Sequence, residues 1–206
     1  MTNFTTEQEK FWAGEFGNEY IQRNRDAKII ANNLAFFAKA LQHTTEIKSC
    51  IEFGANIGLN LIALKQLCPD IQQYAIEINS TAAKQLKDVI GEDNVFEGSI
   101  LQYQPQKQFD LVLSKGVLIH INPDVLDSVY EKLYSSSQKY ILLAEYYNPT
   151  PVNIPYRGHT DKLFKRDWAG DLLTKYTDLQ LIDYGFVYRR DRFPQDDLHW
   201  FLLKKA

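Results

Sequence analysis

Short apolar runs alternate with helical patterns along the chain from about residue 48 to residue 146. Alternation of this kind is typical of βαβ units, in which a helix connects two parallel strands of one sheet. It predicts a parallel sheet that is covered by helices on both faces. The strands that we expect are KSCIEF, QQYAIEI, NVFEGS, FDLVLS and KYILLAEYY. The expected crossover helices include LNLIALKQL, STAAKQLKDVI and DVLDSVYEKLY.

Two regions lie outside this alternation. Before it, apolar residues over 7–41 recur at near-helical spacing, and the pattern breaks around Gly14 and Gly17, which predicts a short helix and a longer one. After it, a proline-rich loop over 148–159 precedes a helix over 166–176. The chain then carries two β-like runs, LQLIDYGFVYR and HWFLLKK, which the turn-prone RFPQDD separates.

The expected fold class is α/β, with a Rossmann-like, mostly parallel seven-stranded sheet, helices on both faces and a C-terminal antiparallel hairpin. The length of 206 residues suits one sizeable core better than two. We therefore expect a single domain over 1–206. Within it, 1–45 would form a helical cover, and 147–177 would form a loop and a helix on the substrate side.

Charge and composition narrow the class of partner. The formal net charge of −3 and the pI near 5.8 argue against a nucleic-acid binder that works by neutralising phosphates. The polar start MTNFTTEQEK lacks the apolar core of a signal peptide, and no apolar run reaches the length of a membrane span. We expect a cytoplasmic protein with a small-molecule partner, no membrane attachment and no metal ion. Cys50 and Cys68 are expected to be buried structural thiols.

A glycine loop, IEFGANIGLN, follows the first expected strand. Gly54 and Gly58 permit a sharp chain reversal and the close approach of a ligand to N–H groups at a helix start, although plain turn chemistry is an alternative. The dinucleotide fingerprint needs G-x-G-x-x-G, whereas Asn56 stands at the middle glycine and Leu59 near the third. A pyrophosphate is therefore disfavoured, and the phosphate-loop pattern is absent from the sequence.

Two acidic residues stand at the ends of the first two strands. Glu52 precedes the glycine loop, where its carboxylate would repel a pyrophosphate and favour a positively charged group. Glu77 ends the second strand, where an acid can accept both ribose hydroxyls; a merely solvated glutamate is the alternative. Beyond the third strand, Ser99 is expected to contact an adenine edge and Ile100 to pack on the ring. A nucleoside without phosphates fits these residues best.

Together these motifs resemble the class I S-adenosylmethionine-dependent methyltransferases, through IEFGANIG, the segment YAIEIN with Glu77 and Ile78, EGSI, and FDLVLSKGVLIHINPDVL. At a finer level, FWAGEFGNEYIQRN and AEYYNPTPVNIPYRGHTDKLFKRDWAG are similar to the pseudaminic acid biosynthesis-associated methylases. The resemblance implies S-adenosyl-L-methionine as cofactor and direct in-line transfer of its sulfonium methyl group. Many relatives have glycine where Asn56 stands and aspartate where Ser99 stands, but asparagine tolerates positive φ and a hydroxyl still bonds to adenine.

The active site of such a sheet lies at the carboxyl ends of its strands. The fourth strand places Lys115 there, which we count with the cofactor residues, and His120, which either deprotonates an acceptor or supports the loop over the cofactor. Glu145, after the fifth strand, either holds or deprotonates an amine or makes a structural hydrogen bond. Residues for a sugar, carboxylate or phosphate, unless their loop is simply solvated, are Tyr147, Asn148, Tyr156, Arg157 and His159.

At steps of four, four and three residues, the N-terminal segment carries Trp12, Phe16, Tyr20 and Arg23. This spacing predicts that the four side chains share one helix face. We expect that face to cover the cofactor, with Trp12 among the residues that bind it. Tyr20, a catalytic candidate, would lie near the methyl sulfonium, and Arg23 or Asn24 near the methionine carboxylate.

Three rival interpretations are weaker. Asn148-Pro149 is similar to the N-P-P-Y motif of DNA amino-methyltransferases, but it reads NPTP and follows the fifth strand, not the fourth. An NAD-dependent short-chain reductase needs Y-x-x-x-K on a helix, and the match at 103–107 contains Pro105. A non-catalytic binding module would show a ruined loop, whereas the glycines and the ribose acid are in place. The sequence thus predicts a methyltransferase that acts on an amine or hydroxyl of a small polar metabolite, a sugar or an amino-acid-like compound.

Overall fold

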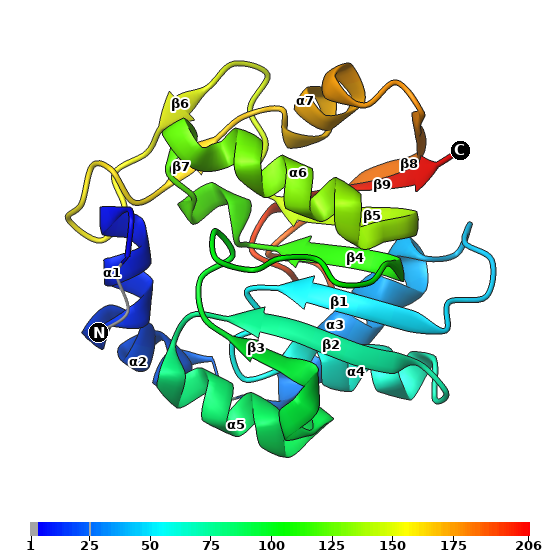
Figure 1. The fold of residues 1–206 in the computed structure, drawn as a ribbon, viewed down its shortest axis with the longest axis horizontal. Helices are drawn as coiled ribbons and strands as arrows, with labels where there is room; N and C mark the ends of the chain where they lie inside the picture. The colour runs from blue at the N-terminus through cyan, green and yellow to red at the C-terminus, as the bar shows by residue number, and fades with distance from the viewer. Residues whose placement is uncertain (1–3, 25) are drawn as a thin grey trace.

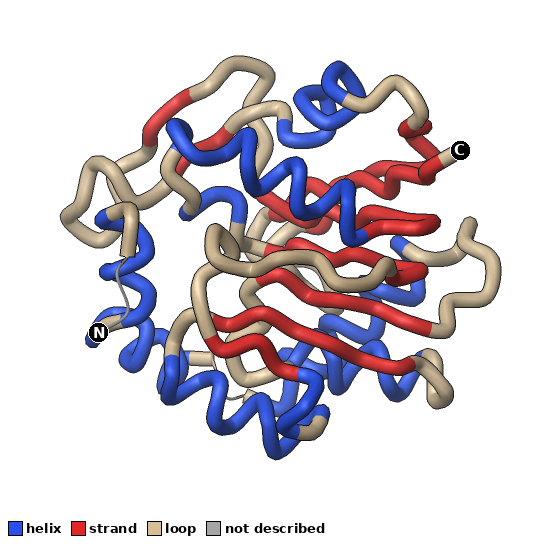
Figure 2. The backbone as a smooth tube through the Cα atoms, in the orientation of Figure 1, coloured by secondary structure: helices blue, strands red, loops and turns tan. Residues whose placement is uncertain are grey.

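A computed structural model describes residues 4–24 and 26–206. In this part of the chain, a seven-stranded sheet has the strand order β3-β2-β1-β4-β5-β9-β8. The strands are β1 (Ser49–Phe53), β2 (Gln72–Glu77), β3 (Val95–Glu97), β4 (Phe109–Lys115), β5 (Ser137–Glu145), β8 (Leu179–Val187) and β9 (Leu198–Lys205). Figures 1 and 2 show the sheet between helices that cover both of its faces. The predicted fold class is confirmed.

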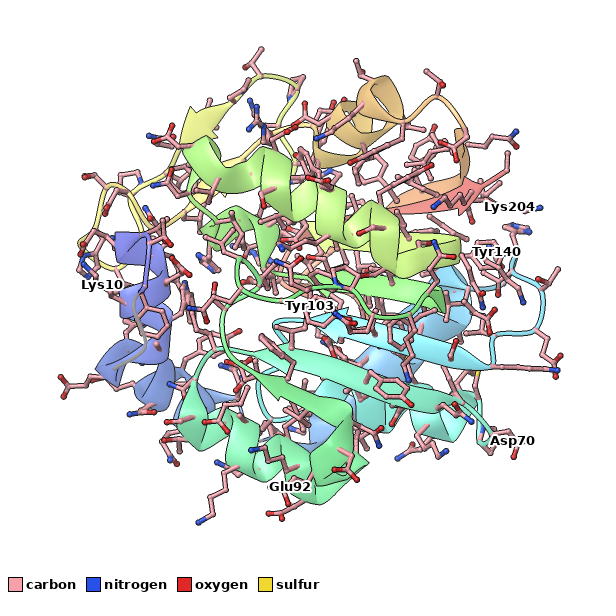
Figure 3. The ribbon with its side chains drawn as sticks, viewed as in Figure 1. Lys10, Asp70, Glu92, Tyr103, Tyr140 and Lys204 are labelled. Carbon is pink, nitrogen blue, oxygen red and sulfur yellow. The ribbon has the colours of Figure 1, made fainter. Side chains whose placement is uncertain are left out.

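The strands from β1 to β5 pair in parallel, and β4 lies at the centre between β1 and β5. The first six residues of β4 are all buried, because both faces of this strand are covered. β9 runs antiparallel to both β5 and β8, which confirms the C-terminal hairpin. Tyr140 of β5 and its register partner Lys204 of β9 lie together at the amino end of β5, away from the carboxyl ends of the parallel strands (Figure 3).

Two layers of helices give the sheet two apolar cores. The helices of the first face are α3 (Ala27–Ala40), α4 (Leu59–Leu67) and α5 (Ser80–Ile90). The helices of the second face are α6 (Leu126–Ser136) and α7 (Trp168–Lys175). Phe37 and Leu64 are fully buried in the first core, and Leu133 and Trp168 are buried in the second. Short 3₁₀ turns are η1 (Glu92–Asn94), η2 (Leu118–His120) and η3 (Pro123–Val125).

The N-terminal segment forms two helices before α3, namely α1 (Glu7–Ala13) and α2 (Glu15–Arg23). The break predicted at Gly14 is confirmed, since this residue ends α1 and begins α2. The prediction for Gly17 is wrong, because Gly17 lies inside α2. Glycine serves close packing there, since a Cβ would stand 2.0 Å from the Trp12 carbonyl oxygen. A further break separates α2 from α3, where the Asp26 side chain accepts a hydrogen bond from the backbone N–H of Lys28.

The segment after β5 folds beside α1 at the carboxyl edge of the sheet (Figure 1). Within it, β6 (Val152–Asn153) and β7 (Phe164–Lys165) form a two-stranded antiparallel sheet that the sequence did not indicate. Gln8 Nε2 of α1 donates to the Asp161 carbonyl oxygen at 2.8 Å. The ring of Phe11 stands edge-on to that of His159. We call α1, α2 and residues 154–163 together the cover.

Among the described residues, none of the helices is both long enough and apolar enough to cross a membrane. Both cysteines are free thiols. Cys50 is completely buried in β1, as predicted. Cys68, directly after α4, is only half-buried, so the prediction holds for one of the two thiols.

The central position of β4 predicts a large effect of a cavity there. Leu113 has no exposed surface, and we expect Leu113→Ala to lower the free energy of unfolding by about 2–5 kcal/mol. Leu181, on the edge strand β8, is 43% exposed, and the matched Leu181→Ala should cost less than about 1 kcal/mol. Urea unfolding followed by circular dichroism measures both values. Equal losses for the two variants would contradict the placement of β4.

Candidate functional site

A cavity opens at the carboxyl ends of the parallel strands, beneath the cover. Its volume is about 1290 Å³, the open mouth included. Its walls come from the glycine loop, the ends of β2, β3 and β4, and the N-terminal helices. The predicted site residues on these walls are Trp12, Tyr20, Gly54, Asn56, Glu77, Ile78, Ser99, Ile100, Lys115 and His120. The structure therefore brings most of the predicted cofactor residues together in one space.

The glycine loop contains three residues with left-handed backbone, at Gly54 (φ 71°), Asn56 (φ 50°) and Gly58 (φ 84°). Asparagine adopts this conformation more readily than most residues, so the loop keeps its shape without a middle glycine. A Cβ on Gly54 would stand 2.7 Å from a methyl group of Val117, which shows how closely the loops after β1 and β4 approach. Gly58 starts α4 and lies outside the cavity wall.

Glu77 ends β2, and backbone groups hold both of its carboxylate oxygens. Oε2 accepts from the N–H of Asn56 at 2.7 Å, and Oε1 accepts from the N–H of Asn79 at 2.7 Å. Burial raises the pKa of Glu77, and these hydrogen bonds act in the opposite direction. Each carboxylate oxygen can accept a second hydrogen bond. Glu77, which lines the cavity, can therefore also accept from hydroxyls on adjacent carbon atoms of a ligand.

Glu52 is completely buried behind the glycine loop and connects to the cavity through Asn60. Asn60 Nδ2 donates to Glu52 Oε1 at 2.5 Å, while Glu52 Oε2 has no hydrogen-bond partner among the described residues. Burial raises the pKa of Glu52 to about 7, although the Asn60 bond and the Lys115 cation lower it. The sequence suggested that Glu52 faces the ligand directly. The structure instead places its carboxylate behind the cavity wall, from where it supplies negative potential.

Near β3, the wall of the cavity is formed by Ser99 and Ile100. Ser99 is 1% exposed, and its Oγ accepts from the N–H of Leu101 at 3.0 Å, so the hydroxyl is engaged in its own turn. Ile100 adds apolar surface. At the opposite side of the cavity, burial lowers the pKa of Lys115 while Glu52 and other carboxylates raise it. The cavity thus has one apolar end and one end with a cation.

His120 ends η2, and its ring lines the cavity. Nδ1 lies 2.6 Å from the carbonyl oxygen of Lys162. Because a carbonyl oxygen only accepts, Nδ1 carries the proton and Nε2 keeps its lone pair. Burial lowers the pKa of His120 to about 4, against the opposite effect of the Lys162 carbonyl. At neutral pH the ring is therefore uncharged, and its unprotonated Nε2 can accept a hydrogen bond or a proton, as a weak base because of the low pKa.

Aromatic rings of the cover meet above the cavity. The prediction of one shared helix face is wrong, because the break at Gly14 puts Trp12 on α1 and the others on α2. The rings still converge: Trp12 stands edge-on to Phe16 and Tyr20, with ring centroids 5.3 Å apart in both pairs. Trp12 also lies 4.5 Å from the ring of His120. Burial raises the pKa of Tyr20 to about 12, so its phenol remains a hydrogen-bond donor.

Arg23 lies outside the cavity. Its guanidinium pairs with Glu19 at 3.3 Å and lies over the ring of Phe16 at 5.2 Å. Asn24, the alternative considered for the methionine carboxylate, does line the cavity. Asn24 Nδ2 also donates to the backbone carbonyl of Tyr20. Of the two neighbouring residues, Asn24 is therefore the one placed to contact a ligand.

Glu145 is enclosed by donors and does not line the cavity. Its carboxylate accepts from Ser114 Oγ at 2.7 Å and from the backbone N–H groups of residues 117–119 at 3.1 to 3.4 Å. Burial raises the pKa of Glu145 to about 7, and these hydrogen bonds lower it. The arrangement favours the structural interpretation over the catalytic one. Glu145 fixes the turn that carries His120.

The proposed substrate residues do not form one cluster, and none of them lines the cavity. Tyr156 is the nearest to the catalytic candidates, with its ring centroid 5.3 Å from that of His120. His159 packs against the outer side of α1 through Phe11. Arg157 lies between them at an exposed turn, with a left-handed backbone (φ 49°). Part of the predicted substrate loop therefore belongs to the cover.

Tyr147 and Asn148 lie elsewhere. The ring of Tyr147 contacts those of His199 and Phe201 on the C-terminal hairpin. Asn148 Nδ2 donates to the Thr150 carbonyl oxygen at 2.6 Å, which closes a local turn. Their positions favour a structural role for both residues.

Sequence reasoning missed several polar residues on the cavity walls. These are Thr6, Gln8, Glu9, Asn33, Asn60, Asn79 and Asn122. One signal was available, since Thr6-x-x-Glu9 is a capping box that marks the start of α1. The asparagines have no comparable sequence signal, because only tertiary packing brings them to the wall.

The buried Glu52 predicts a measurable pH dependence of stability. Its folded-state pKa of about 7 lies above the ordinary value of 4.5, so its contribution to stability is fully present below about pH 4.5 and is lost as the pH rises through about 7. We expect Glu52→Gln to remove up to about 3 kcal/mol of that loss. The free energy of urea unfolding, measured without ligand from pH 5 to pH 8, tests this. Glu46→Gln, at an exposed position, is the control, and an equally steep profile in Glu52→Gln would contradict the assignment.

Known proteins resemble this chain in structure but not detectably in sequence. No family model matches the chain, and no curated protein sequence matches it. The 1,6-didemethyltoxoflavin-N1-methyltransferase of Burkholderia thailandensis, with S-adenosylhomocysteine bound, aligns with a TM-score of 0.69 at 14% identity over 97% of this chain and 87% of its own. The magnesium protoporphyrin IX methyltransferase of Synechocystis PCC 6803, with bound S-adenosylmethionine, gives 0.67 at 14% identity over 100% of both chains. An S-adenosylmethionine-dependent methyltransferase from Archaeoglobus fulgidus gives 0.67 at 15% identity over 93% of this chain and 100% of its own. The chain therefore has the fold of class I S-adenosylmethionine-dependent methyltransferases.

Proposed function

We propose that the chain is an S-adenosylmethionine-dependent methyltransferase that acts on an amine or hydroxyl of a small polar metabolite. The observation that carries this proposal is the Glu77 carboxylate, which lines the cavity beside the glycine loop. Its oxygens can accept further hydrogen bonds beside those from the backbone, and two adjacent ribose hydroxyls would supply them. The fold supports the proposal, because a ligand of such a sheet binds at the carboxyl edge where this cavity lies.

The residues around Glu77 fit the other parts of this cofactor. Toward β3, Ile100 offers apolar surface to an adenine ring. Toward β1 and β4, Lys115 would hold the methionine carboxylate, and Asn60 would contact the amino group. Glu52, with one buried oxygen unpartnered, favours positive charge on the amino and sulfonium groups. When bound, S-adenosylmethionine supplies an electrophilic methyl group on its sulfonium.

In this proposal His120 takes the proton that the acceptor loses. Its Nε2 lone pair is free because Nδ1 donates to the carbonyl of Lys162. Glu145 acts through the backbone of residues 117–119 as a positioning residue for the turn that carries His120. Trp12 and Tyr20 close the cavity from above and keep water from the reacting groups.

We further propose that the acceptor is a sugar or an amino-acid-like compound. The segments FWAGEFGNEYIQRN and AEYYNPTPVNIPYRGHTDKLFKRDWAG are similar to the pseudaminic acid biosynthesis-associated methylases. This similarity supports a sugar as the methyl acceptor. Tyr156, close to His120, and Arg157 offer groups for a hydroxyl or a carboxylate. Solved neighbours carry the names 1,6-didemethyltoxoflavin-N1-methyltransferase and mitomycin 7-O-methyltransferase, so this fold accommodates both nitrogen and oxygen methylation.

Calorimetry tests the cofactor assignment. We expect heat of binding from S-adenosylmethionine and S-adenosylhomocysteine and none from NAD. Removing the 2′-hydroxyl from S-adenosylhomocysteine should weaken binding to the wild type by about tenfold, because a charge-assisted hydrogen bond is lost. Glu77→Ala should bind the intact ligand about tenfold or more weakly and show no further loss for the 2′-deoxy analogue.

Glu97→Ala is the matched control, because Glu97 also ends a strand but pairs with Lys87 at 2.8 Å outside the cavity. No heat from either S-adenosyl compound would overturn the proposed function. A 2′-deoxy penalty of the same size in Glu77→Ala as in the wild type would overturn the ribose assignment alone.

The state of His120 can be measured without an acceptor. Long-range ¹H–¹⁵N spectra report the protonation state of each histidine ring, and the signals that His120→Gln removes belong to His120. From pH 5 upward we expect a neutral His120 ring with its proton on Nδ1. Its titration should lie near pH 4, since burial lowers the pKa to about 4. Once an acceptor is found in a panel of amino sugars and amino acids, His120→Gln should lower kcat about 100-fold or more. A neutral ring with its proton on Nε2, or unchanged turnover in His120→Gln, would contradict the proton-acceptor role.

A further inference from the structure

Glu9 is a buried acid of the cover that the proposed reaction does not use. It occupies α1, is 7% exposed and lines the cavity. Glu9 Oε2 accepts from the N–H of Thr5 at 2.9 Å, from the N–H of Thr6 at 2.7 Å and from Thr6 Oγ1 at 3.0 Å. Glu9 Oε1 is buried and has no hydrogen-bond partner among the described residues.

The capping role of Glu9 does not account for both oxygens. A capping box needs one side-chain oxygen at this position to accept from the backbone at the start of the helix, and Oε2 fulfils that role. A buried acceptor of a carboxylate normally has a donor, because an unsatisfied one is costly. Gln8 Oε1, the neighbouring group on the same cavity wall, is also buried without a partner. This part of the cover therefore presents to the cavity two acceptors that no described protein group satisfies.

The position of Glu9 points to one donor of the proposed cofactor. With the ribose on Glu77 at the tip of β2, the base extends toward β3 and the methionine part toward β1 and β4. Leu101, after β3, and Val125, in η3, line the same cavity as Glu9 of α1. Ser99, the residue expected to meet the adenine edge, accepts from the N–H of Leu101 and keeps one O–H donor and one lone pair. With the ribose hydroxyls assigned to Glu77 and the amino group to Asn60, the exocyclic amine of adenine is the cofactor donor to which no acceptor is yet assigned.

We propose that Glu9 Oε1 accepts a hydrogen bond from the exocyclic amine of the cofactor's adenine. A residue of the cover would then recognise the base. The inference rests on the proposed function, because it concerns the same cofactor. It makes two further statements. The site distinguishes a 6-amino purine from a 6-oxo purine through a residue of α1, and binding of the base holds α1 against the sheet.

The substitution Glu9→Gln tests this directly. Glutamine also fits a capping box, so its oxygen can keep the bonds to Thr5 and Thr6 while its NH₂ group replaces Oε1. The free acceptor thereby becomes a donor. We compare S-adenosylhomocysteine with its inosine analogue, in which a 6-oxo acceptor replaces the 6-amino donor, by calorimetry. The wild type should prefer the adenine ligand by about tenfold or more, and Glu9→Gln should abolish or reverse that preference.

Glu7→Gln is the matched control, since Glu7 lies on the same helix but pairs with Lys10 at an exposed position. It should keep the wild-type preference. Thermal unfolding of both variants checks that the cover and the core stay folded. If the wild type binds S-adenosylhomocysteine and Glu9→Gln keeps the same preference for adenine, the role of Glu9 is overturned while the proposed function stands. If the wild type binds neither ligand, the proposed function itself fails, and this inference fails with it.

Discussion

The hydrogen bonds of Glu77 join the parts of the site to one another. Its two oxygens hold the N–H of Asn56 in the glycine loop and the N–H of Asn79 at the start of α5. Asn79 Nδ2 in turn donates to the Trp12 carbonyl oxygen at 3.2 Å and to Asn18 Oδ1 at 3.0 Å. The tip of β2 therefore connects the loop, a helix of the core and the cover through one network. The residue that we propose for ribose recognition also holds the elements that surround the cavity.

Buried carboxylates dominate the electrostatics of this edge. Glu52, Glu77 and Glu145 end or nearly end parallel strands, and burial raises the pKa of each. Lys115 stands among them, with a pKa that burial lowers and the carboxylates raise. A cationic ligand at this edge would stabilise the ionised form of these carboxylates, whereas a phosphate would oppose it. The backbone of the glycine loop agrees, because Asn56 keeps the left-handed turn but adds a side chain where a pyrophosphate would need space.

The sheet could be predicted from the sequence because each of its signals is local. The apolar runs gave the parallel strands, and the strand ends placed Glu77, Lys115 and His120 at one edge, where the structure has them. The direction in which a side chain points at that edge does not depend on the local sequence alone, because groups from other segments determine it. Glu145 stands at the predicted place, yet it turns toward the backbone of residues 117–119, whose donors no pattern announces.

The helices of the cover could be predicted from the sequence, but the contacts that their side chains make with the site could not. Gly14 signalled its break correctly, whereas Gly17 belongs to a close contact with the carbonyl of Trp12. The contact of Trp12 with His120, at 4.5 Å between ring centroids, joins residues more than a hundred positions apart. No periodicity records such a contact. Glu9 was missed for the same reason. From the sequence, an acid in the first turn of α1 indicates helix capping, and only the tertiary structure shows that it also lines the cavity.

The contacts of the cover also couple its seating to the chemistry below it. The carbonyl of Lys162, in the cover, is the group that fixes the proton of His120 on Nδ1. Gln8 ties α1 to the adjoining residue Asp161. If the cover lifts, His120 loses the partner that defines its tautomer, and water reaches its ring. In the proposed reaction, the seated cover therefore has two effects, since it excludes water and keeps the Nε2 lone pair of His120 unprotonated for the acceptor. The contact that fixes the tautomer of the proposed base belongs to the same segment that covers the cavity.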